Sequence, residues 1–90
     1  MKNYEIIITG RVQGVGFRHY TLQKANELGI LGWVKNMPDD SILIVAQGDE
    51  PVIETFIDFL YIGPTRSRVI QVSKTEIISS TNFHNFSVKY

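Results

Sequence analysis

The sequence predicts an α+β fold in which two helices lie on one face of an antiparallel sheet. The 90 residues are enough for one domain, residues 1–90, and leave no room for a second. Strand-like and helix-like segments follow the order β-α-β-β-α-β, with a short fifth strand at the C-terminus. Each helix-like segment has one apolar face, and a single sheet covered on one side buries both faces.

The first strand and the first helix differ in the spacing of their apolar residues. The Ile- and Val-rich run 4–12 predicts a strand, and its three consecutive isoleucines indicate a central strand that is apolar on more than one face. In the run 17–28, apolar residues recur at helical spacing, which places Phe17 and Leu28 toward the core. Gly29 then supplies a stop signal for the helix.

A hairpin follows the first helix. The runs 30–36 and 42–47 predict its two strands. The turn 37–40 joins them, because Pro38 fixes one backbone angle and aspartate favours turn positions.

A second helix and two further strands complete the chain. The helix begins near Asp49, an acidic N-cap candidate with Pro51 close behind it, and ends at Gly63. The run 68–78 predicts a fourth strand, and alternating apolar residues over 86–90 predict a fifth with one buried face. The order of these elements is typical of the ferredoxin-like α/β sandwich, a fold that settles nothing about chemistry.

The composition excludes several classes of function. Nine basic and nine acidic residues cancel, so the net charge gives no reason to expect nucleic acid or an acidic membrane as a partner. The chain has no cysteine for a disulfide or a thiol nucleophile, and His19 and His84 lack metal-ligand spacing, so we expect no metal. No segment has the length of a signal-peptide core or a membrane span. We therefore expect a cytoplasmic protein, and a monomer because neither helix has a spare apolar face.

A glycine-rich stretch, residues 10–18, joins the first strand to the first helix. Three glycines in seven positions keep side chains off the backbone, so a small anion can approach main-chain N–H groups. The first turn of a helix leaves its own N–H groups unpaired and partly positive, and the planar guanidinium of Arg18 suits two phosphate oxygens. The stretch therefore predicts a phosphate cradle.

The same stretch has an alternative interpretation, because glycine-rich turns between a strand and a helix are common and most of them bind nothing. It does not fit the dinucleotide-binding fingerprint, since His19 occupies the position of the third glycine. It also lacks the Gly-Lys-Ser/Thr ending of the nucleoside-triphosphate loop.

Two motifs together resemble the acylphosphatases. The first is Gly10-x-Val12-Gln13-Gly14-Val15-Gly16-Phe17-Arg18, and the second is Leu28-Gly29-x-x-Gly32-Trp33-Val34-x-Asn36. The likeness continues through Gly48 and Gly63-Pro64 to the closing Phe86-x-Val88-x-Tyr90, so it covers nearly the whole chain in order.

This resemblance implies hydrolysis of the carboxyl–phosphate bond of an acyl phosphate to a carboxylate and inorganic phosphate, with no metal and no cofactor. It implies that Arg18 and the main-chain N–H groups of the cradle hold the phosphoryl group; the cradle residues are Gln13, Gly14, Val15, Gly16 and Phe17. It also implies that Asn36 positions the attacking water and that the phosphate of the substrate accepts the proton. The residues suit this chemistry, because phosphoryl transfer asks mainly for positioning and charge stabilisation, and an amide can orient water but not deprotonate it.

The sequence departs from the family pattern in the hairpin turn. Asp40 stands where the family usually has glycine, so we expect a changed turn, in a backbone region that aspartate tolerates better than most residues. His19 is expected to be a surface residue rather than a catalytic one. Because the cradle contacts only the phosphoryl end and no acyl pocket is recognisable, we expect tolerance toward the acyl group.

Three other functions are alternatives to an acylphosphatase. One is a binding module of the same fold that holds phosphate or another small anion, although it would not need Asn36. Another is an accessory domain that handles carbamoyl phosphate inside a larger maturation protein, against which a 90-residue chain starting at Met1 argues. The last is a nucleic-acid-binding module, which the balanced charge and the absence of an exposed aromatic pair on a central strand disfavour.

Overall fold

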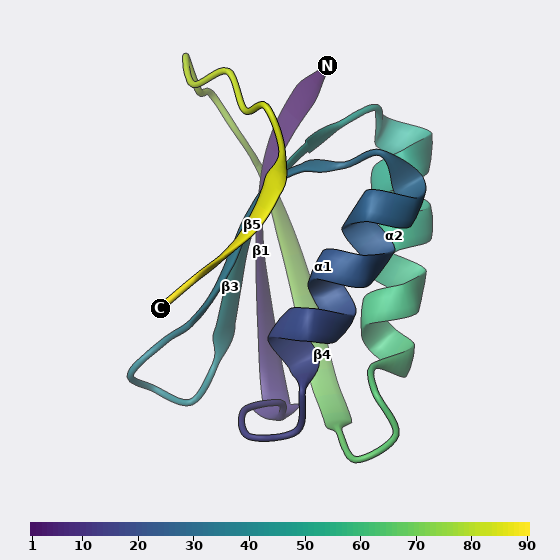
Figure 1. Ribbon diagram of the computed structural model, residues 1–90, viewed down its shortest axis with the longest axis vertical. Helices are drawn as coiled ribbons and strands as arrows, with labels where there is room; N and C mark the ends of the chain where they lie inside the picture. The colour runs from purple at the N-terminus through teal and green to yellow at the C-terminus, as the bar shows by residue number, and fades with distance from the viewer.

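A computed structural model describes all 90 residues as two layers, a five-stranded sheet and two helices on one of its faces (Figure 1). The elements are β1 (Lys2–Arg11), α1 (Phe17–Leu28), β2 (Leu31–Asn36), β3 (Ile42–Gly48), α2 (Glu50–Ile62), β4 (Arg68–Ile77) and β5 (Phe86–Lys89). The strand order in the sheet is β4-β1-β3-β2-β5. The predicted ferredoxin-like α+β fold is confirmed, and each element begins and ends within two residues of its predicted bounds.

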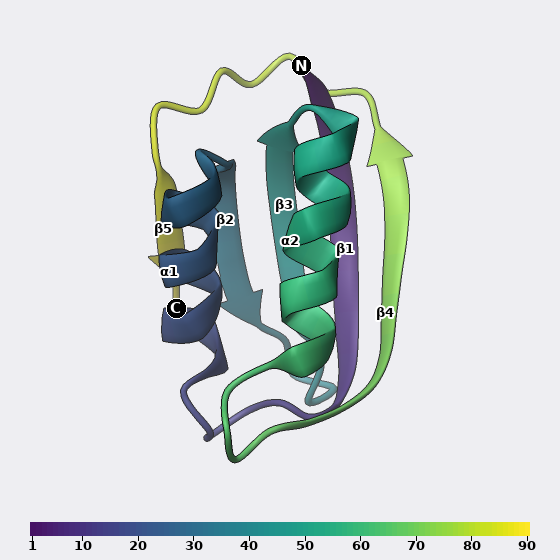
Figure 2. The same cartoon turned by 90° about the vertical axis from the view of Figure 1, so that its right-hand side faces the viewer.

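The prediction of an antiparallel sheet is right for four strands and wrong for the fifth. β1 pairs antiparallel with both β3 and β4, and β2 pairs antiparallel with β3, but β5 pairs parallel with β2. The segment between β4 and β5 crosses the end of the sheet at which β2 begins (Figure 2). There the N–H of Gly32 donates a hydrogen bond of 2.9 Å to the carbonyl of Asn85. Since β5 enters the sheet at the end where β2 starts, it runs in the same direction.

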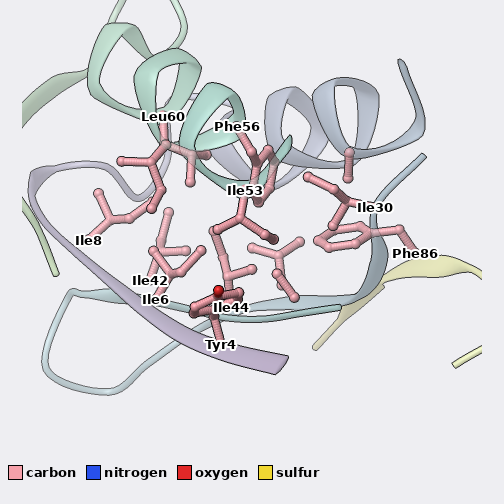
Figure 3. Close-up of a cluster of buried hydrophobic side chains, with 14 of the residues drawn as sticks. Tyr4, Ile6, Ile8, Ile30, Ile42, Ile44, Ile53, Phe56, Leu60 and Phe86 are labelled. Atoms are coloured by element: carbon pink, nitrogen blue, oxygen red, sulfur yellow. The ribbon is translucent and has the colours of Figure 1, made fainter. Parts of the chain in front are cut away.

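The core lies between the helices and the covered face of the sheet (Figure 3). β1 occupies a central position, as the three isoleucines predict, and its residues alternate: Ile6 and Ile8 are 0% exposed, whereas Ile7 is 37% exposed on the open face. The ring of Phe56 on α2 packs against that of Phe86 on β5 at 6.3 Å between centroids. Each such side chain contributes about 1.5–3 kcal/mol when fully buried.

The two helices divide the sheet between them. α1 covers β2 and β5, and α2 covers the other half (Figure 2). α1 buries Phe17, Thr21 and Ala25, and Leu28 packs half-buried against the core. Asp49 is the N-cap residue of α2, as predicted, but its side chain makes no capping hydrogen bond. Neither helix has the length and apolar character required to span a membrane.

The β2–β3 turn adopts the backbone conformation expected from the departure at Asp40. Asp40 has φ +72°, and it is the one residue other than glycine with a positive φ. The N–H of Met37 donates to the carbonyl of Ser41 at 2.9 Å. One carboxylate oxygen of Asp39 accepts hydrogen bonds from the hydroxyl and the N–H of Ser41, and these bonds lower the pKa of Asp39. The Asp39 carboxylate therefore supports the turn above its ordinary pKa and loses this effect as the pH falls through the lowered value.

Gly32 allows β2 and β3 to approach each other closely. It has φ +135°, and a Cβ added there would lie 1.9 Å from the carbonyl oxygen of Val45. Both the backbone angle and the contact therefore require glycine.

We predict that Gly32→Ala destabilises the fold by about 3 kcal/mol or more, because the new methyl group meets backbone rather than a flexible side chain. Urea unfolding followed by circular dichroism measures the effect. Gly48→Ala is the matched control, since its added Cβ would lie 3.5 Å from the Cδ1 of Ile53, an ordinary contact. Equal midpoints for the two variants would contradict this account of β2.

We predict that Asp40→Gly stabilises the fold by up to about 1 kcal/mol. A left-handed conformation costs an L-residue about 1–2 kcal/mol, and glycine removes this cost; glycine also loses more conformational entropy on folding, which offsets part of the gain. Asp39→Gly serves as the control and should destabilise the turn, since Asp39 accepts the hydrogen bonds of Ser41. A lower unfolding midpoint for Asp40→Gly would show that the turn does not carry this strain.

Candidate active site

The glycine-rich loop between β1 and α1 presents free main-chain N–H groups. Gly14 and Gly16 have φ +72° and +81°, and a Cβ added to either would meet nothing within 4 Å. The N–H groups of residues 14, 15 and 16 donate no hydrogen bond within the chain. Gly16 is the N-cap of α1, whose first turn contains no acidic residue. The partial positive charge of the helix N-terminus is therefore uncompensated.

The Gln13 side chain anchors this loop to the β2–β3 turn. Its Nε2 donates to the carbonyl of Met37 at 2.8 Å and to the carbonyl of Ser41 at 2.9 Å. The side chain is therefore occupied, and only the main chain of Gln13 is available to a ligand. The side chains of Val15 and Phe17 attach the loop to the core, since Val15 packs against the core and Phe17 is 2% exposed.

A cavity of about 410 Å³ opens beside the loop. Its lining residues come from the glycine-rich loop, the N-terminal half of α1 and the ends of β2 and β5; Figure 2 shows α1 lying over these two strands. Its lining comprises Val12, Gly14, Gly16, Phe17, Arg18, His19, Leu22, Asn36, Val88 and Tyr90.

The cavity brings most of the predicted site residues together. Gly14, Gly16, Phe17, Arg18 and Asn36 line it, whereas Gln13 and Val15 lie outside the lining. His19 is exposed, as predicted for a surface residue, but it also lines the cavity.

Sequence reasoning missed the residues that line the other side of the cavity, Leu22, Val88 and Tyr90. Two signals existed. Leu22 lies one helical turn after Arg18, and Val88 and Tyr90 continue the alternation of apolar and polar residues that begins at Phe86. The pairing of β5 with β2, which brings these residues together, is not a local property of the sequence.

Arg18 is half-buried and its charge has no acidic partner. Every ion pair in the chain uses a lysine, and none uses Arg18. Its guanidinium carbon lies 4.5 Å from the centroid of the Tyr90 ring, a cation–π contact that orients the side chain without neutralising it. Arg18 can therefore pair with an anion in the cavity.

Asn36 ends β2 with an unsatisfied acceptor. Its Oδ1 is buried and accepts no hydrogen bond. A buried acceptor without a partner costs about 1–3 kcal/mol, so this oxygen gains from any donor that enters the cavity. No three His, Cys, Asp or Glu side chains come together in a group that could hold a metal ion.

Comparisons with known proteins identify the family. The acylphosphatase family model matches residues 4–88. The acylphosphatase of Lactobacillus johnsonii is 47% identical over 91 residues that cover 100% of both chains. The crystal structure of acylphosphatase from Bacillus subtilis is 40% identical and superposes with a TM-score of 0.95 over 100% of both chains.

A larger protein contains a similar domain. The crystal structure of T. kodakarensis HypF superposes with a TM-score of 0.89 and 37% identity, covering 100% of this chain but 12% of that one. The family model and the full-length relatives together cover nearly every residue of the sequence. The chain belongs to the acylphosphatase family.

Proposed function

We propose that this chain hydrolyses acyl phosphates to a carboxylate and inorganic phosphate, without metal or cofactor, in the cavity beside the glycine-rich loop. One observation carries the proposal. Gly14 and Gly16 with their free main-chain N–H groups, the unpaired Arg18, and Asn36 with its unsatisfied Oδ1 line one cavity. Donors for an anion and an acceptor for water are thus available within a single site.

The first step is capture of the phosphoryl group. Its oxygens accept hydrogen bonds from the main-chain N–H groups of residues 13–17 and from the Arg18 guanidinium, which approaches two oxygens at once. Because these N–H groups are fixed by the loop and make no other bond, they need no rearrangement as negative charge shifts in the transition state.

The second step is attack by water. The Oδ1 of Asn36 accepts a hydrogen bond from the water and so orients it, with a lone pair of the water oxygen pointing at phosphorus. A P–O bond to water forms in line with the leaving group, the P–O bond to the acyl oxygen breaks, and its electron pair leaves with the carboxylate. The water proton passes to a phosphate oxygen of the substrate, because Asn36 cannot accept it. A carboxylate is a good leaving group, so no protein acid is required.

The remaining expectations from the sequence belong to the same proposal. The substrate is a small-molecule acyl phosphate, inorganic phosphate is a product, and neither nucleic acid nor a membrane is a partner. The chain acts as a monomer, as one domain over residues 1–90, in the cytoplasm.

A second candidate function is supported by the likeness to HypF, in which a similar domain is a small part of a longer chain. Such a domain would handle its acyl phosphate as part of a larger protein. The relatives that match over 100% of both chains are themselves named acylphosphatases, which favours the first function.

We predict that Arg18→Ala and Asn36→Ala each lower kcat/KM by about 10²–10³-fold while the fold is retained. Loss of one transition-state donor such as Arg18 typically has this effect, and loss of the acceptor that positions the water misplaces a reacting group, which costs about 10²-fold. The measurement is the hydrolysis rate of an aromatic acyl phosphate in excess chelator, with circular dichroism of each variant. Arg66→Ala and Asn26→Ala are matched controls, because both side chains are exposed and neither lines the cavity. Abolition of wild-type activity by the chelator, or equal losses in the controls, would overturn the proposal.

A further inference from the structure

The cavity is larger and more apolar than a phosphoryl group requires. Its volume of about 410 Å³ lies within the range of about 300–1,000 Å³ that is usual for small-molecule sites. Five of its ten lining residues are hydrophobic. Phosphate oxygens need donors and positive charge, and an apolar wall supplies neither. The apolar side of the cavity therefore has no role in holding the phosphoryl group.

This apolar wall comes from two elements that face each other. Leu22 lies one turn after Arg18 on α1, so the two side chains share a face of the helix. Val88 pairs with Val34 across β5 and β2, and both point toward the helices. Tyr90 follows Val88 by two residues and continues the same face. Leu22, Val88 and Tyr90 thus line the cavity with apolar surface from both elements; we call these three residues the acyl wall.

The acyl wall adjoins both groups proposed for catalysis. Asn36 lies two residues beyond Val34 on the same face of β2, next to the end of β5. The Tyr90 ring contacts the Arg18 guanidinium at 4.5 Å. A substrate whose phosphoryl group is held by Arg18 therefore has its acyl group within reach of the wall.

The wall is exposed enough to gain from a ligand. Tyr90 is 92% exposed, and Leu22 and Val88 are only half-buried. Covering apolar surface of this kind stabilises a complex in proportion to the area removed from water. An acyl group with a ring or a branched chain covers more of the wall than a methyl group does.

We propose that Leu22, Val88 and Tyr90 form a subsite for the acyl group and give the enzyme a preference for acyl phosphates with an aromatic or bulky apolar acyl group. This inference rests on the proposed hydrolysis of acyl phosphates. It narrows the tolerance expected from the sequence: several apolar acyl groups are accepted, but acetyl-sized ones are used less well.

The test compares two substrates that share the phosphoryl end. For each variant, kcat/KM is measured with benzoyl phosphate and with acetyl phosphate in excess chelator. The value for benzoyl phosphate is then divided by the value for acetyl phosphate. Differences in intrinsic reactivity between the substrates are the same for every variant, so they cancel when the ratios are compared. Any shift of Arg18 affects both substrates and cancels as well.

We expect the wild-type enzyme to favour benzoyl phosphate about tenfold or more. One methylene in an apolar pocket changes kcat/KM by about 10–200-fold, and the low end applies here because the acyl wall is partly open. Leu22→Ala and Tyr90→Ala should each lower the ratio at least about threefold. Val88→Thr should lower it too; threonine has nearly the shape of valine but adds a hydroxyl, so circular dichroism confirms that this variant is folded. Gln23→Ala is the control, since this exposed residue of α1 does not line the cavity; its ratio should stay at the wild-type value.

The outcomes separate this inference from the proposed function. Hydrolysis with the same ratio in all variants would overturn the acyl wall and leave the hydrolysis standing. No hydrolysis of either substrate would overturn the proposed function. In that case calorimetry is carried out with two phosphonates, the analogues of benzoyl phosphate and of acetyl phosphate in which a methylene replaces the bridging oxygen. Tighter binding of the phenyl analogue than of the methyl analogue supports the acyl wall, and equal binding overturns it.

Discussion

Two hydrogen bonds from the Gln13 side chain hold the candidate site together. They run from the glycine-rich loop to the carbonyls of Met37 and Ser41, which lie 24 and 28 residues further along the chain. The loop carries the free N–H groups, and the turn directly follows Asn36. Without these bonds, the two halves of the site would depend on separate elements of the fold. A displacement of about 1 Å between reacting groups can cost about 10²-fold in rate, so in the proposed reaction the alignment of water and phosphoryl group depends on Gln13.

The candidate site gathers several polar groups that have no partner within the chain; outside it, the buried hydroxyl of Tyr4 also has none. Elsewhere, main-chain groups pair within helices and strands, and the lysines pair with glutamates. In the cavity, the loop N–H groups, the Arg18 guanidinium and the Oδ1 of Asn36 have no polar partner. Such departures from local stability rules are expected where a protein binds or reacts with a ligand. Tyr90 contributes to this balance, because its ring holds Arg18 in place without removing its charge.

The sequence predicted the elements well because their signals are local. Helical spacing located α1 at Phe17–Leu28, and the isoleucines of β1 indicated a central strand. The direction of β5 could not be predicted in this way, because it depends on where the chain crosses the sheet after β4. For the same reason the apolar side of the cavity was not recognised, since Leu22 and Val88 meet only when β5 pairs with β2. The phosphate-binding role of Arg18 was predicted from the glycine-rich stretch as well as from the family resemblance, and the role of Asn36 from the resemblance alone. Neither the local pattern nor the resemblance indicated that the Gln13 side chain anchors the loop.

The central claim is that main-chain N–H groups of the glycine-rich loop hold the phosphoryl group. Amide spectra of nitrogen-15-labelled protein, titrated with inorganic phosphate in excess chelator, test it most directly. We predict saturable shifts of the N–H resonances of residues 13–18 and of the Arg18 side chain, at phosphate concentrations that inhibit hydrolysis. Resonances of β4, which does not line the cavity, should stay in place. Inhibition by phosphate without any shift in the loop, or shifts confined to another part of the sheet, would contradict the account.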